Sequence, residues 1–142
     1  MTMSPCVFCD IIQGQSPASV VYADEQAIAF MDIQPVVTGH LLVIPRAHAA
    51  SLAELDPGTG AHLFRVGMQL AAALRRSTLR CEGVNFFLAD GEVAGQDVFH
   101  VHLHILPRFQ GDGFGLHFPP GYWDRPSRDA LDALAAQVRE AL

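Results

Sequence analysis

Three histidines alternate with hydrophobic residues in segment 98–106, Val-Phe-His-Val-His-Leu-His-Ile-Leu, which Pro107 closes. Successive side chains of an extended chain point to opposite faces. As a strand, this segment would present His100, His102 and His104 on one face and aliphatic residues on the other. A helix would scatter the three imidazoles around its circumference. We therefore predict a strand whose aliphatic face lies in the core.

A row of imidazoles supports three kinds of chemistry. Same-face neighbours lie about 6.6 Å apart along a strand, so His100 and His102 could share a metal ion. A neutral imidazole can instead attack an electrophilic phosphorus and form a covalent intermediate. An imidazolium can bind an anion, although weakly at neutral pH because its ordinary pKa is about 6.5. Purely structural histidines, bonded to backbone groups, are the remaining alternative.

Composition bounds the class of protein. The chain has 142 residues, of which 50% are hydrophobic and 17% charged, so we expect one folded domain over residues 1–142. The net charge of −6 comes without a cluster of Lys and Arg, which argues against duplex DNA or an anionic membrane as a partner. Without a basic, apolar leader or a run near the ~18 apolar residues of a membrane span, we expect a cytoplasmic location.

Two of the three cysteines, Cys6 and Cys9, are separated by two residues. In a reducing compartment this spacing favours a metal half-site or a redox pair over a disulfide framework. A tetrahedral zinc site would need two further ligands. The third cysteine, Cys81, is expected to act as a small apolar residue.

Turn and breaker residues predict an antiparallel sheet. Strands are expected at 20–22, 27–32 and 40–44, which would form a meander. A further strand at 84–89 would precede the histidine strand. With two helices, this pattern indicates an α+β fold in which the helices pack on one side of the sheet.

The two helices have clear start signals. Asp56 as N-cap and Pro57 as first residue predict a long helix that runs to about Ser77. A final helix is expected to start at Ser127. Its inward face is predicted to contain Leu131, Leu134, Ala135 and Val138.

Residues 100–106 match the pattern His-φ-His-φ-His-φ-φ, where φ is hydrophobic, and so the chain resembles the histidine-triad (HIT) nucleotide-binding family. Further blocks similar to family segments, in family order, are 6–12, 30–35, 39–45 and 94–96. The resemblance covers roughly residues 6–108, and 111–115 is similar to a segment of bacterial, zinc-carrying members. It implies a HIT-like α+β core over about 6–108, a C-terminal segment and helix over 109–142, and a two-fold homodimer.

The resemblance also implies an activity. HIT enzymes act on the α-phosphate of purine nucleotide conjugates such as phosphoramidates, aminoacyl adenylates or dinucleoside polyphosphates. The chain would thus be a nucleoside phosphoramidase or nucleotidyl hydrolase. His102 matches the family nucleophile, which forms a nucleotidyl-histidine that water resolves. Its tautomer would be fixed by a backbone carbonyl of a neighbouring segment. His104 would stabilise charge on the phosphate, and His40 matches a buried histidine that supports the triad.

The same resemblance implies binding residues and a metal. Asp32 matches the position that holds the ribose hydroxyls. The base pocket would be formed by Phe8, Ile11, Phe30 and Ile33. Gln96 and the backbone N–H of Val98 are candidate phosphate donors. Bacterial members complete a structural Cys2His2 zinc site with two histidines, which makes the predicted ligands Cys6, Cys9, His48 and His100.

Two positions depart from the family pattern. Asp97 stands where many members have a Ser or Thr that can donate toward the leaving group, and Ala89 stands where several have Asn or Gln. These differences motivate an alternative, a nucleotide-sensing module with little turnover. A third possibility is a metal-dependent hydrolase with His100 and His102 on a catalytic ion.

Overall fold

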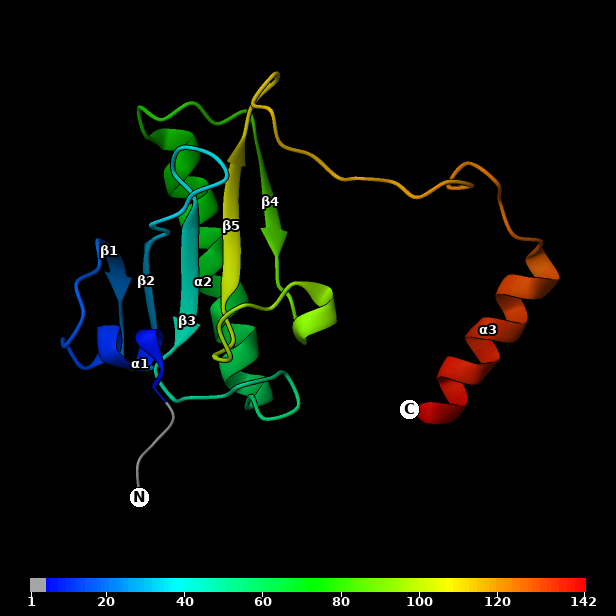
Figure 1. Cartoon of the computed structure of the whole chain (residues 1–142), viewed down its shortest axis with the longest axis horizontal. Coiled ribbons are helices and arrows are strands. Elements are labelled where there is room, and N and C mark those ends of the chain that lie inside the picture. Colours follow the sequence, from blue (N-terminus) through cyan, green and yellow to red (C-terminus); the bar gives the residue numbers. More distant parts are fainter. Residues whose placement is uncertain (1–4) are drawn as a thin grey trace.

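The structure is a computed structural model of the chain, and it describes residues 5–142. Five strands form one antiparallel sheet in the order β1-β2-β3-β5-β4 (Figure 1). The strands are β1 (Val20–Ala23), β2 (Ala27–Met31), β3 (Leu41–Pro45), β4 (Gly83–Phe87) and β5 (Leu103–Arg108). The helices are α1 (Val7–Ile12), α2 (Pro57–Arg76), α3 (Arg128–Ala141) and a short 3-10 helix, Glu92–Ala94. The predicted α+β class and the β1–β2–β3 meander are confirmed.

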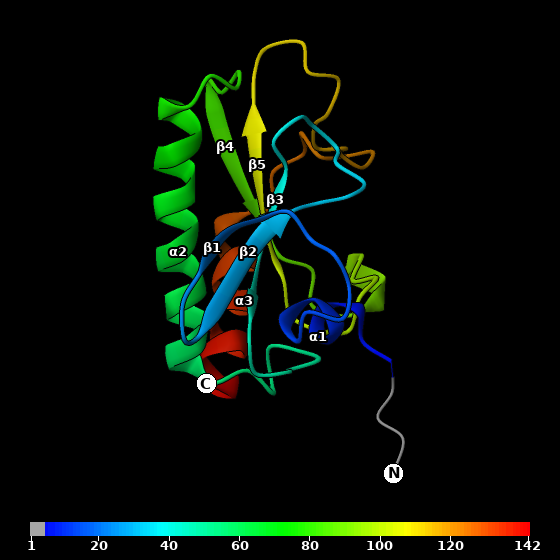
Figure 2. The ribbon, with the colours of Figure 1, turned by 90° about the vertical axis from the view of Figure 1, so that its left-hand side faces the viewer.

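Helix α2 covers one face of the sheet (Figure 2). It begins as predicted, because the Asp56 carboxylate accepts a hydrogen bond of 3.0 Å from the backbone N–H of Thr59. Gly67 allows close packing, since a Cβ there would lie 3.0 Å from Phe86 and 3.1 Å from Ile105. The buried residues on this helix are Leu63, Val66, Gly67, Leu70 and Leu74. Within residues 5–142, none of the helices combines the length and hydropathy needed to cross a membrane.

Part of the opposite face of the sheet is covered by α1, a helix that the sequence pattern did not predict, so the helices do not all pack on one side (Figure 2). Phe8 is the buried residue of α1, and it packs against a second apolar cluster on β2 and β3. The other buried members of this cluster are Ile28, Phe30, Leu42 and Ile44. Strand β3 therefore lies between two layers, and all five of its residues are buried.

The histidine segment is only partly a strand, because β5 starts at Leu103 and continues through Pro107. The prediction of a strand over 98–106 is therefore wrong for its first half. There the chain is held by the loop after β3, where the backbone N–H of Val101 donates to the carbonyl of Ala49 at 2.8 Å. The alternation of faces persists nevertheless: Val101, Leu103 and Ile105 all belong to the core cluster under α2.

The C-terminal arm, residues 109–142, extends away from the sheet and ends in α3 (Figure 1). Its start is fixed by Arg108, whose guanidinium donates to both carboxylate oxygens of Asp112 at 2.6 and 2.9 Å. Helix α3 starts as predicted after the N-cap Ser127, but none of its residues is buried. The predicted inward packing is therefore wrong, because the apolar stripe of α3 has no partner surface within residues 5–142.

Candidate functional site

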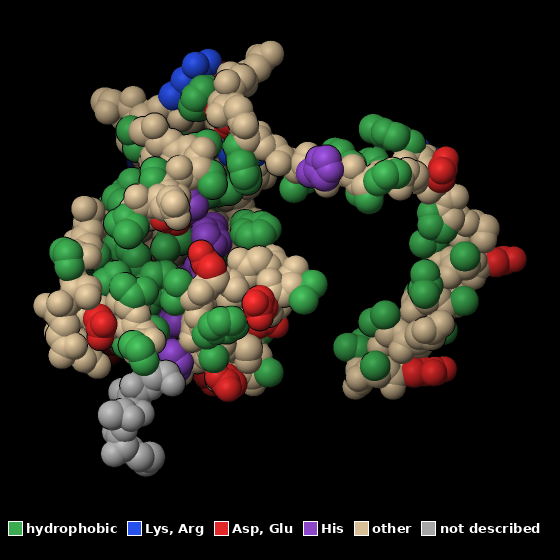
Figure 3. Space-filling view, viewed as in Figure 1, with side chains coloured by type: hydrophobic (Ala, Val, Ile, Leu, Met, Phe, Trp, Pro, Cys, Tyr) green, Lys and Arg blue, Asp and Glu red, His purple; other side chains and the backbone are tan. Residues whose placement is uncertain are grey.

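His102 is oriented by the backbone of its own segment. Its Nδ1 lies 2.8 Å from the carbonyl oxygen of His100, which can only accept a hydrogen bond, so Nδ1 carries the ring proton and Nε2 keeps a lone pair. The carbonyl was expected from a neighbouring segment, but it comes from two residues earlier because the chain is not strand-paired there. The ring is 3% exposed, with the edge of Phe8 against it at 5.2 Å between centroids. Figure 3 shows histidines (purple) along the middle of this face.

A chain of hydrogen bonds determines which ring nitrogen carries the proton in His40 and in His104. The backbone N–H of Val36 donates to Nδ1 of His40 at 3.2 Å, which leaves the proton of His40 on Nε2. That Nε2–H donates to Nδ1 of His104 at 2.8 Å. His104 therefore carries its own proton on Nε2. The ring centroids of His102 and His104 lie 4.9 Å apart. The lone pair on Nε2 of His102 and the Nε2–H donor of His104 are therefore side by side.

Both supporting histidines are neutral near pH 7. Burial, together with the charges of His102 and His40, lowers the pKa of His104 to about 4. Burial also lowers the pKa of His40, although the carboxylate of Asp32 opposes this shift. The tautomers assigned from the hydrogen bonds consequently hold across the neutral range.

Asp32 follows β2 and lies beside this chain. One carboxylate oxygen accepts from the backbone N–H of Gln34 at 2.8 Å, and the other lies 3.4 Å from Nε2 of His40. Its side chain is 17% exposed, so it is reachable from solvent while held in place.

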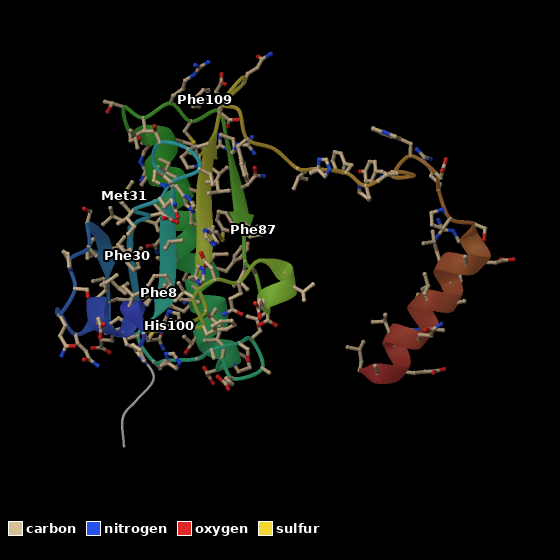
Figure 4. All side chains as sticks on the ribbon, in the orientation of Figure 1. Phe8, Phe30, Met31, Phe87, His100 and Phe109 are labelled. Atoms are coloured by element: carbon tan, nitrogen blue, oxygen red, sulfur yellow. The ribbon has the colours of Figure 1, made fainter. Side chains whose placement is uncertain are left out.

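The residues expected in the base pocket divide into two groups. Phe8 and Phe30 are buried with ring centroids 5.6 Å apart, and Ile11 packs against the same cluster. Figure 4 shows Phe8 between Phe30 and His100. Ile33 is 96% exposed and lies outside the cluster.

Gln96 braces the loop before the histidine segment. Its side-chain amide donates to the carbonyls of Ala50 and Val98 at 2.7 and 3.1 Å, and its oxygen accepts from the N–H of Gly91 at 2.8 Å. To donate to a phosphate, this amide would have to give up one of these bonds. Next to it, Asp97 has its Oδ1 3.6 Å from Nε2 of His102 and a side chain that is 84% exposed.

The four predicted metal ligands come together from three parts of the chain. One ligand atom from each of Cys6, Cys9, His48 and His100 lies within 4.8 Å of the others. The two histidine Nδ1 atoms are 3.2 Å apart, and sulfur–nitrogen distances are 3.3 Å for Cys9–His48 and 3.5 Å for Cys6–His100. A tetrahedron with Zn–S of about 2.3 Å and Zn–N of about 2.0 Å has edges of about 3.3 to 3.8 Å. The cluster therefore has the size of a zinc site.

The protonation of this cluster also fits a cation. His100 has Nε2 2.8 Å from the carbonyl of Pro45, so the proton is on Nε2 and the lone pair of Nδ1 faces the sulfurs. Burial, with the hydrogen bond and charge of Cys6, raises the pKa of the Cys9 thiol to about 11. Two thiolates this close are stable only with a positive charge between them. Donor set and geometry both fit a structural zinc with four protein ligands.

A backbone carbonyl was expected to orient His102, but the sequence did not show which residues supply the backbone groups that orient the imidazoles. The carbonyls of Pro45 and His100 and the N–H of Val36 fix the tautomers of three imidazoles. Every residue carries such groups, so no residue type marks them in a sequence. Only folding decides which ring they meet.

Comparison with known proteins identifies the family. Residues 13–111 match the HIT domain, and the chain therefore belongs to the HIT family. A HIT family protein from Bacillus anthracis is 37% identical, with 99% of each chain covered and a TM-score of 0.89. A zinc-bound histidine triad family protein from Mycobacterium smegmatis is 40% identical over 96% of this chain and 97% of that one, with a TM-score of 0.75. A histidine triad nucleotide-binding protein from Candida albicans is 29% identical over 96% of each chain, with a TM-score of 0.84.

Proposed function

We propose that this protein is a nucleotide hydrolase or transferase that acts on the α-phosphate of purine nucleotide conjugates. Membership of the HIT family supports a nucleotide-binding, hydrolase-type function in general. The observation that carries the specific proposal is the pair of rings with opposite roles. His102 offers the lone pair of Nε2, and neutral His104 offers an N–H next to it.

In this proposal, Nε2 of His102 attacks the phosphorus, and the bond to the leaving group breaks with its electron pair on that group. The His100 carbonyl, which accepts from Nδ1–H, stabilises the positive charge that the ring then carries. The Nε2–H of His104 donates to a phosphate oxygen. Water next attacks the phosphorus of the nucleotidyl-histidine, which releases the monophosphate and restores the neutral ring.

The nucleotide would be bound by groups around this pair. Asp32 can accept from both ribose hydroxyls. Phe8, Ile11 and Phe30 supply an apolar wall for the base, and exposed Ile33 would close over the base from the solvent side. The N–H of Val98 would hold the phosphate, while Gln96 keeps its loop in place.

We further propose a structural zinc on Cys6, Cys9, His48 and His100, which would join α1, the loop after β3 and the histidine segment. The ion would take no part in a chemical step. Its effect on catalysis would be positional, because His100 also supplies the carbonyl that orients His102. A catalytic metal on His100 and His102 is disfavoured, since the free lone pair of His100 faces the two cysteines.

A homodimer would account for the exposed arm. Hydrophobic side chains line α3, including Leu134 and Val138 at 55% and 63% exposed (Figure 3). The arm is about a quarter of the chain, so the TM-score of 0.89 with the Bacillus anthracis protein requires most of the arm to superpose. The extended arrangement thus recurs in a crystal of a relative. A second copy of this chain is the partner that we propose for the stripe.

The test of the enzymatic proposal compares the wild type with His102→Ala. With an adenosine 5′-phosphoramidate, the variant should lose turnover while it still binds AMP in calorimetry. Rapid quenching of the wild-type reaction should trap a protein with one added nucleotidyl mass. Equal turnover by the variant would refute the mechanism. AMP binding by a wild type that neither turns over substrate nor becomes labelled would favour the sensing module.

A further inference from the structure

We infer that Cys6 and Cys9 form a redox switch, in which a peroxide converts the two zinc-binding thiolates into a disulfide and weakens the attachment of α1 to the histidine segment. This inference rests on the structural zinc proposed above and on the nucleotide site that α1 borders. It adds regulation by oxidation, which neither the zinc nor the hydrolytic activity implies. The spacing of the two cysteines is compatible with a metal half-site and with a redox pair, and the structure supports both uses in turn.

The two sulfurs are close enough to form a bond after a small rotation of the side chains. Cys6 is the N-cap of α1, and its Sγ accepts a hydrogen bond of 3.4 Å from the backbone N–H of Cys9. The ligand atoms of the cluster, both sulfurs included, all lie within 4.8 Å of one another. The third thiol, Cys81, donates to the carbonyl of Gly83 and is not part of this cluster. The pair that oxidation can join is therefore Cys6 with Cys9.

A small oxidant can reach this pair. Cys6 and Cys9 are half-buried, and both line an open groove of about 1050 Å³ between α1 and the loop 97–99. Hydrogen peroxide is little larger than a water molecule and fits in such a groove. His100, in contrast, is completely buried. An oxidant that enters from solvent consequently meets the sulfurs first.

The oxidation takes two steps. One thiolate sulfur attacks a peroxide oxygen, the O–O bond breaks and hydroxide leaves, which gives a sulfenic acid. The second thiolate attacks the sulfenic sulfur, the S–O bond breaks with its electron pair on oxygen, and a second hydroxide leaves. The two sulfurs have then lost two electrons and the peroxide has gained two. Because disulfide sulfurs carry no negative charge, only two neutral imidazoles remain as ligands, and the cation is released.

Release of the cation acts on the nucleotide site through α1. The ring of Phe8 in α1 lies against His102 and His100, with centroids 5.2 and 5.8 Å apart. Helix α1 has six residues and Phe8 is its one buried side chain, so the zinc ligands supply much of what holds this helix in place. Phe8 also belongs to the wall proposed for the base. Oxidation should therefore weaken nucleotide binding.

The test treats the zinc-loaded protein with hydrogen peroxide and measures released zinc with a chromophoric chelator, the mass of the intact chain, and AMP affinity by calorimetry. The wild type should release one zinc ion per chain and become lighter by two hydrogen atoms, with the disulfide between Cys6 and Cys9. The Kd for AMP should rise roughly tenfold. A dithiol reductant together with zinc should reverse all three changes.

Two variants show whether the disulfide causes the release. Cys9→Asp keeps a side chain that zinc accepts as a ligand but removes one sulfur, so its zinc should stay bound in peroxide. Cys6→Asp replaces it in the test if Cys9→Asp does not retain zinc on purification. Cys81→Ser is the matched control and should behave like the wild type.

The possible failures are distinguishable. Zinc that stays bound in the peroxide-treated wild type, or that leaves without a Cys6–Cys9 disulfide, would overturn this inference alone. Equal zinc release from the aspartate variant, or an unchanged AMP affinity in the disulfide form, would also contradict it. A purified protein without zinc would instead overturn the zinc proposal. A reduced, zinc-loaded protein that does not bind AMP would overturn the proposed function.

Discussion

Replacement of His40 by Phe should reduce catalysis by releasing the tautomer of His104. Phe keeps the ring volume at this 3% exposed position but removes both nitrogens. Nδ1 of His104 then loses its donor at 2.8 Å, and the N–H of Val36 loses its acceptor at 3.2 Å. The ring proton of His104 can then move to Nδ1, which turns a lone pair of Nε2 toward the phosphate instead of an N–H.

The expected magnitude follows from the cost of one unsatisfied buried polar group, about 1 to 3 kcal/mol. Since about 1.4 kcal/mol corresponds to a factor of ten, kcat/KM should fall by roughly 5- to 150-fold. The free energy of unfolding should fall by a similar 1 to 3 kcal/mol, because Val36 is left without its partner. His40→Gln is the matched control, since its side-chain amide can still donate to His104 and should restore most of the activity.

The assay combines steady-state kinetics on an adenosine phosphoramidate with nitrogen-15 NMR of the His104 ring. The nitrogen shifts report directly which ring atom carries the proton. If His104 keeps its proton on Nε2 in His40→Phe and kcat/KM is unchanged, the tautomer argument is wrong. Equal losses in the Phe and Gln variants would show that packing, and not the donated hydrogen bond, matters at this position.

Three further predictions concern the metal, pH and self-association. The purified protein should contain one zinc ion per chain by mass spectrometry. The Cys9→Ala variant should lose the zinc, and its Tm should fall by about 10 °C or more, since each kcal/mol of lost binding energy corresponds to several degrees. The control Cys81→Ala should keep both the zinc and the Tm of the wild type. Because the folded-state pKa of His104 is about 4 and its ordinary value 6.5, the unfolded chain binds more protons between these values. The free energy of unfolding should therefore fall by on the order of 2 kcal/mol as the pH drops from 6.5 to 4. In thermal melting at a series of pH values, His104→Phe should make this fall smaller. If the stability of the variant and of the wild type changed with pH in parallel, the assignment of this pH dependence to His104 would be wrong. Finally, Leu134→Ser with Val138→Ser should weaken dimerisation about 1000-fold in sedimentation analysis, since burying these half-exposed side chains is worth about 1 kcal/mol each and a dimer has two arms. Glu140→Ser, on the polar side of α3, is the control, and an unchanged dissociation constant would remove α3 from the interface.

Local features of the fold were predictable because side chains of neighbouring residues determine them. The cap at Asp56, the alternation at 98–106 and the meander of β1 to β3 all depend on residues close together in the chain. The spacing of Cys6 and Cys9 likewise predicts half of a metal site. The histidine pattern and the ordered blocks were sufficient to predict the family, which the match over residues 13–111 confirms.

Only the tertiary structure decided which distant groups meet. Strand β5 starts late because the loop after β3, and not β3 itself, takes the hydrogen bond of Val101. The ring tautomers depend on backbone carbonyls of Pro45 and His100, which look the same at every position of a sequence. The stripe of α3 was visible in the sequence, but a stripe does not say whether the surface that buries it belongs to the same chain. The local pattern of residues determines the secondary structure of a segment, whereas long-range contacts determine which groups of the protein it meets. The chemistry proposed for His102 depends on these long-range contacts.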